Sequence, residues 1–224
     1  MASNGAGANR KGKGYELKIA KMFSKYSGKE FKRSPMSGAW SSTWAGGGHD
    51  EVAGDIIAPS DEIFPYSLEL KNHESFSLIN LFTTGGEIPQ FINQVMGDAI
   101  RTHKIPALIL HKNRSKNYFV LPYSTELFKK LDDNLYNYFV TRLVYTSDID
   151  DEVRSYKAIV TTLDDIMVLY SYPEFVSLGL ECYSNWLNND NEKTVDIHKN
   201  KAGNKETKKS KFDLDSDLAK ELGL

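Results

Sequence analysis

Three residues in the first third of the chain carry side chains suited to metal-assisted hydrolysis. Asp55 lies in a mostly apolar segment, and Glu69 and Lys71 close the next apolar segment. Hard divalent cations such as Mg²⁺ prefer oxygen ligands, and a bound cation neutralises a phosphate and generates hydroxide at neutral pH. A lysine beside the carboxylates holds the attacking water or stabilises developing negative charge. The expected chemistry is hydrolysis of a phosphodiester, with Mg²⁺ or Mn²⁺ as the cofactor.

The Glu-x-Lys triplet is unspecific by itself, because it occurs four times in the chain. Residues 16 to 18 fall on a predicted helix, where positions two apart point in different directions. Residues 30 to 32 follow no strand that bears an Asp, and residues 206 to 208 lie in a polar segment. Only residues 69 to 71 end an apolar strand that follows another apolar strand containing Gly-Asp. The alternative for this triplet is a surface ion pair on an exposed edge strand.

Two predicted strands must position these groups, one over residues 52 to 58 and one over residues 63 to 71. In the second, apolar residues alternate with polar ones, so Glu69 and Lys71 share one face of the strand. Neighbouring strands lie about 4.8 Å apart, so carboxylates on the same face can share one metal. The spacing therefore allows Asp55 and Glu69 to form one site.

The surrounding segments predict an α/β core. Apolar residues at three- and four-residue spacing predict an amphipathic helix over residues 14 to 26, with Glu16 at the border of its buried stripe. A second helix is expected from Pro89 onward. Residues 106 to 111 and 118 to 121 are typical of two further strands joined by a polar hairpin.

The composition divides the chain into five parts. Helical spacing over residues 125 to 143 predicts that the region after the core is mainly helical. The acidic tail is suited to docking on a partner protein, and a frayed end is the alternative. The expected parts are a flexible basic arm (1 to 13), a core (14 to 122), an extension packed on the core (123 to 187), a polar linker (188 to 211) and an acidic amphipathic tail (212 to 224).

Charge and composition indicate a possible binding surface and the cellular compartment of the protein. The whole chain has a net charge of -2, but residues 1 to 34 contain nine Lys or Arg against Glu16 and Glu30, a local charge of about +7. This region is a candidate phosphate-binding surface, or else a solvated lysine-rich helix. The single cysteine, Cys182, cannot form an internal disulfide, which favours a reducing intracellular compartment. No apolar run is long enough to predict a membrane-spanning helix. We expect it in the cytoplasm or associated with the nucleoid, and in the host cytoplasm if its source is a virus.

Four segments, in order along the chain, resemble the PD-(D/E)XK nuclease superfamily and, within it, the archaeal-type Holliday junction resolvases. The matching segments are RKGKGYELKIAKMF, FKRSPMSG, AGDIIAP and SLELK, and the resemblance covers about residues 10 to 122. It implies a restriction-endonuclease-like fold with a mixed central sheet flanked by helices. It also implies a homodimer that cuts branched DNA, with roles in recombination and repair.

The resemblance assigns roles to the residues of the motif. Asp55 and Glu69 are implied metal ligands, with the backbone carbonyl of Leu70 as a further ligand. Lys71 is implied to orient water or stabilise the transition state. Glu16 matches the glutamate of the family's first helix, which assists the metal site, and a surface charge on a helix is the alternative.

The resemblance also implies contacts with DNA. Arg33 and Ser37 match residues that approach the scissile phosphate, and arginine suits a phosphate fork. Ser37 is equally explained by loop chemistry. Lys11 and Lys13, in the first matching segment, belong to the basic region expected to bind DNA.

The loop from residue 40 to residue 50 is long for a resolvase. Its tryptophans, Trp40 and Trp44, are placed either to stack on unpaired bases or to pack on the protein. Three neighbouring side chains compete with Asp55 for the role of metal-binding acid: His49, Asp50 and Glu51. In addition, Gly54 stands where the superfamily has proline.

Several polar side chains after the second strand have less specific interpretations. Gln90 and Gln94 resemble positions used near the site by related nucleases, but solvated side chains are the favoured interpretation. His73 is interpreted as incidental rather than as a phosphate contact. Residues 123 to 224 have no recognised counterpart in the resolvases.

The leading hypothesis is a structure-selective DNA endonuclease, a Holliday junction resolvase in particular. The alternatives within the superfamily are a restriction-like, nicking or exonucleolytic DNase. A non-catalytic DNA-binding recruitment protein is the alternative from another class, and the intact acidic pair and lysine argue against it.

Overall fold

A mixed β-sheet forms the centre of the computed structural model, which describes residues 4–35, 54–74, 76–83, 86–147, 151–187 and 192–194. The helices are α1 (Asn4–Ser27), α3 (Asn80–Thr83), α4 (Ile88–Arg101), α5 (Thr125–Asp133), α6 (Leu163–Leu169) and α7 (Tyr172–Leu187). The strands are β1 (Lys32–Arg33), β2 (Ile56–Ile57), β3 (Tyr66–Asn72), β4 (Ile105–His111), β5 (Tyr118–Pro122), β6 (Phe139–Thr146), β7 (Val153–Thr162) and β8 (Glu192–Thr194).

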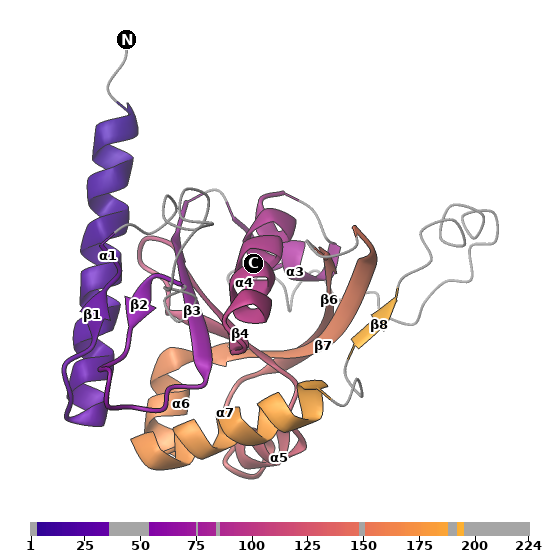
Figure 1. The fold of residues 1–224 in the computed structure, drawn as a ribbon. Helices are drawn as coiled ribbons and strands as arrows, with labels where there is room; N and C mark the ends of the chain where they lie inside the picture. Colours follow the sequence, from indigo (N-terminus) through magenta and orange to yellow (C-terminus); the bar gives the residue numbers. More distant parts are fainter. Residues whose placement is uncertain are drawn as a thin grey trace, which may run out of the picture.

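The strand order in the sheet is β3-β4-β5-β7-β6, and β8 pairs with β7. Strands β3 and β4 are parallel, in register from Tyr66 opposite Ile105 to Asn72 opposite His111, and α4 connects them. The other pairs in this sheet are antiparallel. Strand β3 ends this order, and the small β1-β2 ribbon lies between it and α1 (Figure 1).

Helices cover both faces of the sheet. On one face, α1 and α7 bury Phe23 and Phe175 against Leu68 and Ile109. On the other, α4 buries Val95 and other apolar residues against the alternate positions of β4 and β7. Because side chains alternate along a strand, β3 directs Leu68 and Leu70 toward α1 and its odd-numbered residues toward α4.

The structure confirms the predicted α/β class with a mixed sheet flanked by helices. The helix expected over residues 14 to 26 lies within α1, and the helix expected from Pro89 is α4. The strands expected over residues 106 to 111 and 118 to 121 are β4 and β5.

Residues 4 to 13, predicted as a flexible arm, form the first turns of α1 in the structure. A helix that is already nucleated extends by one hydrogen bond per residue, at low cost. Lys11 also forms an ion pair with Glu74 beyond the end of β3, which ties this part of the helix to the core.

Helical structure after the core ends earlier than the spacing predicts. Ser124 caps α5 by accepting a hydrogen bond from the Leu127 amide, and the helix stops at Asp133. Leu135 has a positive φ of 58° and is 91% exposed, so it interrupts the apparent helical period. The following residues form β6, which pairs along its whole length with β7. The extension therefore contributes two long strands to the sheet as well as helices.

Part of the predicted polar linker is also ordered against the sheet. Residues 192–194 form β8, which pairs with β7 from Tyr156 to Arg154. The rest of the predicted linker and the predicted tail lie outside the described residues. Among the described helices, none combines the length and apolar character needed to cross a membrane.

Candidate active site

The backbone of β3 holds Asp55 at the outer edge of the sheet. The Asp55 amide donates a hydrogen bond of 2.7 Å to the Leu68 carbonyl, and Asp55 Oδ2 accepts one of 2.8 Å from the Leu70 amide. The side chain is only 5% exposed. Both ends of this residue are thus fixed to the same strand.

Gly54 makes this close approach feasible. Its φ is +86°, and a Cβ atom added there would lie 2.6 Å from the Leu68 carbonyl oxygen. Any larger residue would be strained in this conformation and would push the chain away from β3. Local geometry therefore accounts for the glycine that stands in place of proline.

Glu69 lies on the side of β3 that faces α4, and it is 2% exposed. Its Oε1 atom is 2.5 Å from Lys71 Nζ, two residues along the same face. Lys71 Nζ also donates a hydrogen bond of 2.8 Å to Gln94 Oε1 of α4 and lies 5.2 Å from the centre of the Phe91 ring. The lysine is therefore held between the buried glutamate and α4.

Burial makes both carboxylates hard to ionise. It raises the pKa of Asp55 from 3.8 to about 6, opposed by the Leu70 hydrogen bond and reinforced by the negative charge of Glu16. Burial and then the charge of Asp55 raise the pKa of Glu69 from 4.5 to about 8, although Lys71 opposes the rise. The two acids thus repel each other in a site with little water.

Glu16 and Arg33 reach the same site from α1 and β1. The guanidinium of Arg33 forms an ion pair with the Glu16 carboxylate, and both side chains are largely buried. Arg33 lies opposite Ile56 in the β1-β2 ribbon, and the Ser34 amide donates a 2.8 Å hydrogen bond to the Asp55 carbonyl. The structure thus brings two further predicted residues next to Asp55.

The backbone of Leu70 is turned toward Asp55 as well. The amide and carbonyl of one residue in a strand point to the same edge, and the Leu70 amide donates to Asp55 rather than to β4. The Leu70 carbonyl therefore also points to the outer edge.

These groups fit a hard divalent cation. Within the described residues, no cluster of three or more His, Cys, Asp or Glu side chains has the arrangement of a metal site. The available donors are two carboxylates and one carbonyl, all oxygen, which is the chemistry that Mg²⁺ and Mn²⁺ prefer. Burial is the main cause of the raised pKa of both acids, and a divalent cation bound between them would oppose it by favouring the ionised forms.

Other predicted residues lie away from this cluster or outside the description. Lys11 pairs with Glu74, with 2.7 Å between Nζ and Oε1, and Lys13 is exposed on α1. Outside the described residues are Ser37, Trp40, Trp44, His49, Asp50 and Glu51.

Two residues of α4 join the site that the sequence did not single out for it. The favoured interpretation of Gln94 as a solvated side chain is wrong, because Gln94 accepts a hydrogen bond from Lys71. Gln90, one turn earlier, is exposed. The sequence pattern did not point to Asp98, whose charge adds to the raised pKa of both Asp55 and Glu69. Asp98 could have been found from its position seven residues after Phe91, which places both on the same face of the helix.

His73 lies just beyond the end of β3. Its Nδ1 is 3.3 Å from Glu87 Oε2, and its ring packs edge-on against Phe91. These two contacts explain the position of the His73 side chain without a bound ligand.

Comparison with protein families identifies the chain. The profile of one family, described as phage putative PDDEXK endonuclease, matches residues 7–177. The chain belongs to this family. Membership makes it a nuclease of the PD-(D/E)XK superfamily, a hydrolase for which DNA is the class of substrate. No curated protein and no solved structure matches the chain.

The matched range shows how much of the fold the PDDEXK family shares. It begins within α1 and ends within α7, so it includes β6 and β7. The resemblance to resolvases ended near residue 122, whereas the PDDEXK match includes the strands that complete the sheet. Asp55 and residues 69 to 71 lie within the matched range.

Proposed function

We propose that this chain is a metal-dependent DNA endonuclease whose metal site consists of Asp55, Glu69 and the Leu70 carbonyl. One observation carries the proposal. Two acids from separate segments are buried at the edge of β3, beside a lysine, although burial disfavours ionisation of both and the charge of Asp55 further disfavours that of Glu69. Such an arrangement is costly for folding alone, and buried acids with raised pKa values are typical of functional sites.

A bound Mg²⁺ or Mn²⁺ would supply positive charge to the scissile phosphate and lower the pKa of water. Lys71, held by Glu69 and Gln94, orients the attacking water or stabilises negative charge on the phosphate. Gln94 acts through Lys71 and is a positioning residue.

Glu16 and Arg33 serve the same reaction from the other side of Asp55. Arg33 offers a planar guanidinium suited to a phosphate oxygen. Glu16 holds that guanidinium in place and assists the metal site. Ser37 belongs to the same proposed phosphate contact, and Trp40 and Trp44 are proposed to contact bases.

For the substrate, we propose branched DNA, and a four-way junction in particular, cut by a homodimer. The support is the ordered resemblance of residues 10 to 122 to the Holliday junction resolvases. Restriction-like, nicking and exonucleolytic activities are the alternatives that an assay must separate.

The test is a cleavage assay on four DNA substrates: a four-way junction, a flap, a nicked duplex and a linear duplex, each with and without Mg²⁺. Symmetrical paired cuts on the junction are the expected result. Preferential cutting of another substrate would overturn the resolvase assignment and leave the nuclease assignment intact. Binding of junctions without any cleavage would favour the non-catalytic alternative.

The residue assignments are tested in the same assay. Asp55→Asn and Glu69→Gln keep the shape of each side chain, so both variants should bind DNA but lose cleavage by at least about 100-fold, the scale of a lost catalytic contact. Unchanged cleavage in either variant would refute its role as a metal ligand.

A further inference from the structure

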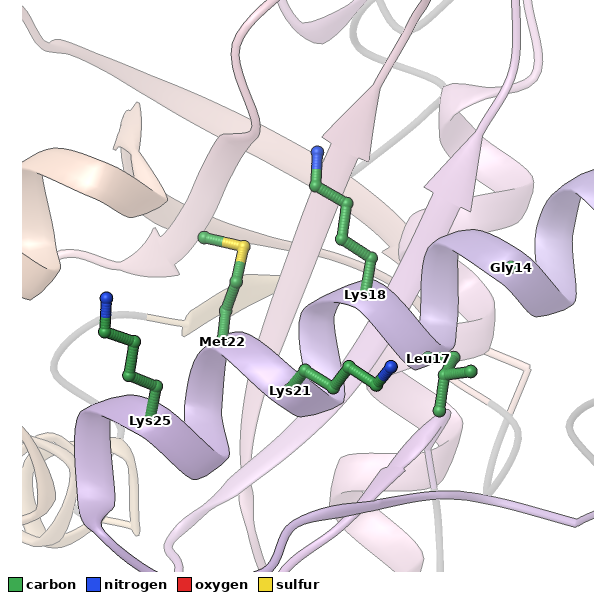
Figure 2. A pocket seen from close by; sticks show the side chains of 6 residues that line it. All are labelled: Gly14, Leu17, Lys18, Lys21, Met22 and Lys25. Atoms are coloured by element: carbon green, nitrogen blue, oxygen red, sulfur yellow. The ribbon is translucent and has the colours of Figure 1, made fainter.

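The exposed side of α1 is strongly basic. From Arg10 to Ser27 the helix contains one acidic residue, Glu16, and this residue pairs with Arg33. Exposed basic side chains follow the helix at Arg10, Lys11, Lys13, Lys18, Lys21 and Lys25. Lys11, Lys18 and Lys25 recur every seven residues, which places them along one line of the helix. Figure 2 shows Lys18 and Lys25 extending to the same side, with Met22 between them.

The hairpin between β4 and β5 lies against this side of α1. The Tyr15 ring stacks on His111 with 5.0 Å between centroids, and Tyr15 Oη donates a 3.0 Å hydrogen bond to Asn117 Oδ1. Glu74 Oε1 accepts hydrogen bonds from Lys11 Nζ at 2.7 Å and from the Asn113 amide at 3.1 Å. Contacts at both ends of the hairpin therefore fix its position beside the helix.

The hairpin adds three exposed basic side chains: Lys112, Arg114 and Lys116. The charges of α1 and the hairpin act on the same groups. Both Lys11 and Lys112 contribute to the lowered pKa of Glu74, and Lys18 and Lys11 add to the effect of burial in lowering the pKa of His111. Opposing acids are Glu74, already paired, and Asp164 near Tyr15. We call Lys11, Lys18, Lys25, Lys112, Arg114 and Lys116 the basic ridge.

The basic ridge and the carboxylates lie on different flanks of α1. Lys11 and Lys18 are four residues before and three residues after Tyr15, so they share the flank that packs on His111. Glu16 points about 100° away, toward Arg33 and Asp55. Lys13, three residues before Glu16, belongs to that catalytic flank. A ligand on the basic ridge therefore does not need to enter the active site.

We propose that the basic ridge binds the backbone phosphates of duplex DNA outside the cleavage site. The proposal rests on the proposed function, because a DNA endonuclease must hold a polymer that is longer than its catalytic centre. Lys11 and Lys25 are separated by about 21 Å along the helix, the rise of roughly six base pairs. Regular lysine spacing suits a phosphate backbone, which is bound through charge.

The test measures binding of a labelled 30-base-pair blunt duplex by fluorescence anisotropy in EDTA, so that no cleavage takes place. Lys18→Glu and Lys116→Glu each reverse one ridge charge. Each should weaken binding about tenfold at low salt and reduce the slope of log Kd against log salt by about one. The double variant should lose more than either single variant.

Lys129→Glu is the matched control, because it reverses the charge of an exposed lysine on α5, at the other end of the fold from the first half of α1 (Figure 1). It should bind within about twofold of the unmodified chain. Thermal melting verifies folding, and Lys18→Gln, which only neutralises the charge, should give a smaller loss. Ridge variants that bind like Lys129→Glu, with an unchanged salt slope, would overturn the proposal.

The cleavage assay distinguishes this proposal from the proposed function. In the ridge variants KM for the DNA substrate that the chain cleaves should rise while kcat at saturating DNA stays unchanged. If the unmodified chain cuts nothing, the proposed function fails, but the binding result in EDTA still decides the role of the basic ridge.

Discussion

Glu69 is surrounded by one positive and two negative groups. Lys71 lies 2.5 Å away, while Asp55 and Asp98 both raise the pKa of its carboxyl group beyond the effect of burial. In the metal-free protein these effects favour the protonated form of Glu69, and a bound cation would exchange for the proton. This exchange links stability, metal binding and pH at one residue.

The link predicts how stability depends on pH. Because the pKa of Glu69 is raised from 4.5 to about 8, the metal-free folded chain holds a proton that the unfolded chain has lost between these pH values. Stability must then fall as pH rises through this window, because the unfolded state binds fewer protons. The metal-free melting temperature should drop by several degrees from pH 5 to pH 8, and much less in Glu69→Gln. Equal slopes in both proteins would show that Glu69 is not the group responsible.

Gln94 gives a second prediction at a single residue, with Gln90 as its control. Gln94→Ala removes the hydrogen bond that orients Lys71, so kcat should fall roughly tenfold, the value of one lost hydrogen bond of about 1.4 kcal/mol. KM for DNA should change little. Gln90→Ala, one turn away and exposed, should retain kcat within about twofold. A loss of the same size in both variants would contradict a specific role for Gln94.

Strand β3 could be predicted from local pattern, whereas the strand predicted over residues 52 to 58 is only partly correct. In its described part only Ile56–Ile57 form a strand, which pairs with β1 and not with β3, and Asp55 lies in a bend before it. Alternation along β3 placed Glu69 and Lys71 on one face, and this is how the strand is built. The alternation did not show that α4 packs over that face. This packing involves residues distant in the chain, such as Lys71 and Gln94, which are 23 residues apart. For the same reason the sequence did not point to Asp98. A helical pattern predicts which residues of α4 are buried, but not which strand they pack against.

Packing of α7 on β3 leads to a prediction about two helical glycines. A Cβ atom at Gly179 of α7 would lie 2.5 Å from Pro65 Cγ and 2.6 Å from Tyr66 Cζ, whereas one at Gly14 of α1 would contact nothing within 4 Å. Gly14→Ala should therefore stabilise the fold by about 0.5 to 1 kcal/mol. Gly179→Ala should destabilise it by about 1 to 3 kcal/mol, because overpacking outweighs helix propensity. Urea unfolding measures both, and stabilisation by Gly179→Ala would contradict the close packing of α7 on β3.

The sheet depends on strands that the sequence pattern did not reveal. Leu135, Phe139 and Leu143 continue the four-residue spacing of α5, so local periodicity favoured helix. Pairing with β7, distant in the chain, decides that residues 139 to 146 are a strand. Strand β7 in turn pairs with β5 from Tyr118 to Pro122, and Phe175 of α7 stacks on Tyr66 at 4.4 Å.

A truncation tests this dependence at the scale of the whole molecule. A chain that ends at Pro122 keeps every proposed catalytic residue but loses β7, β6 and α7. It should show no cooperative thermal transition by circular dichroism, because the edge of β5 and the apolar face of β3 would be exposed to water. A chain that ends at Thr194 should melt cooperatively. Cooperative unfolding of the shorter chain would show that residues 14 to 122 form an independent core.

The central claim is that Asp55 and Glu69 together hold the cation that drives DNA cleavage. The most direct measurement uses covalently closed supercoiled DNA whose inverted repeat extrudes a four-way junction. It compares cutting by the unmodified chain and by Glu69→Gln in Mg²⁺, at protein concentrations that give equal DNA binding. The unmodified chain should nick or linearise the circles, which have no ends, and only when Mg²⁺ is present. Glu69→Gln should leave them intact. Cleavage by Glu69→Gln at the unmodified rate, or cleavage in EDTA, would contradict the account.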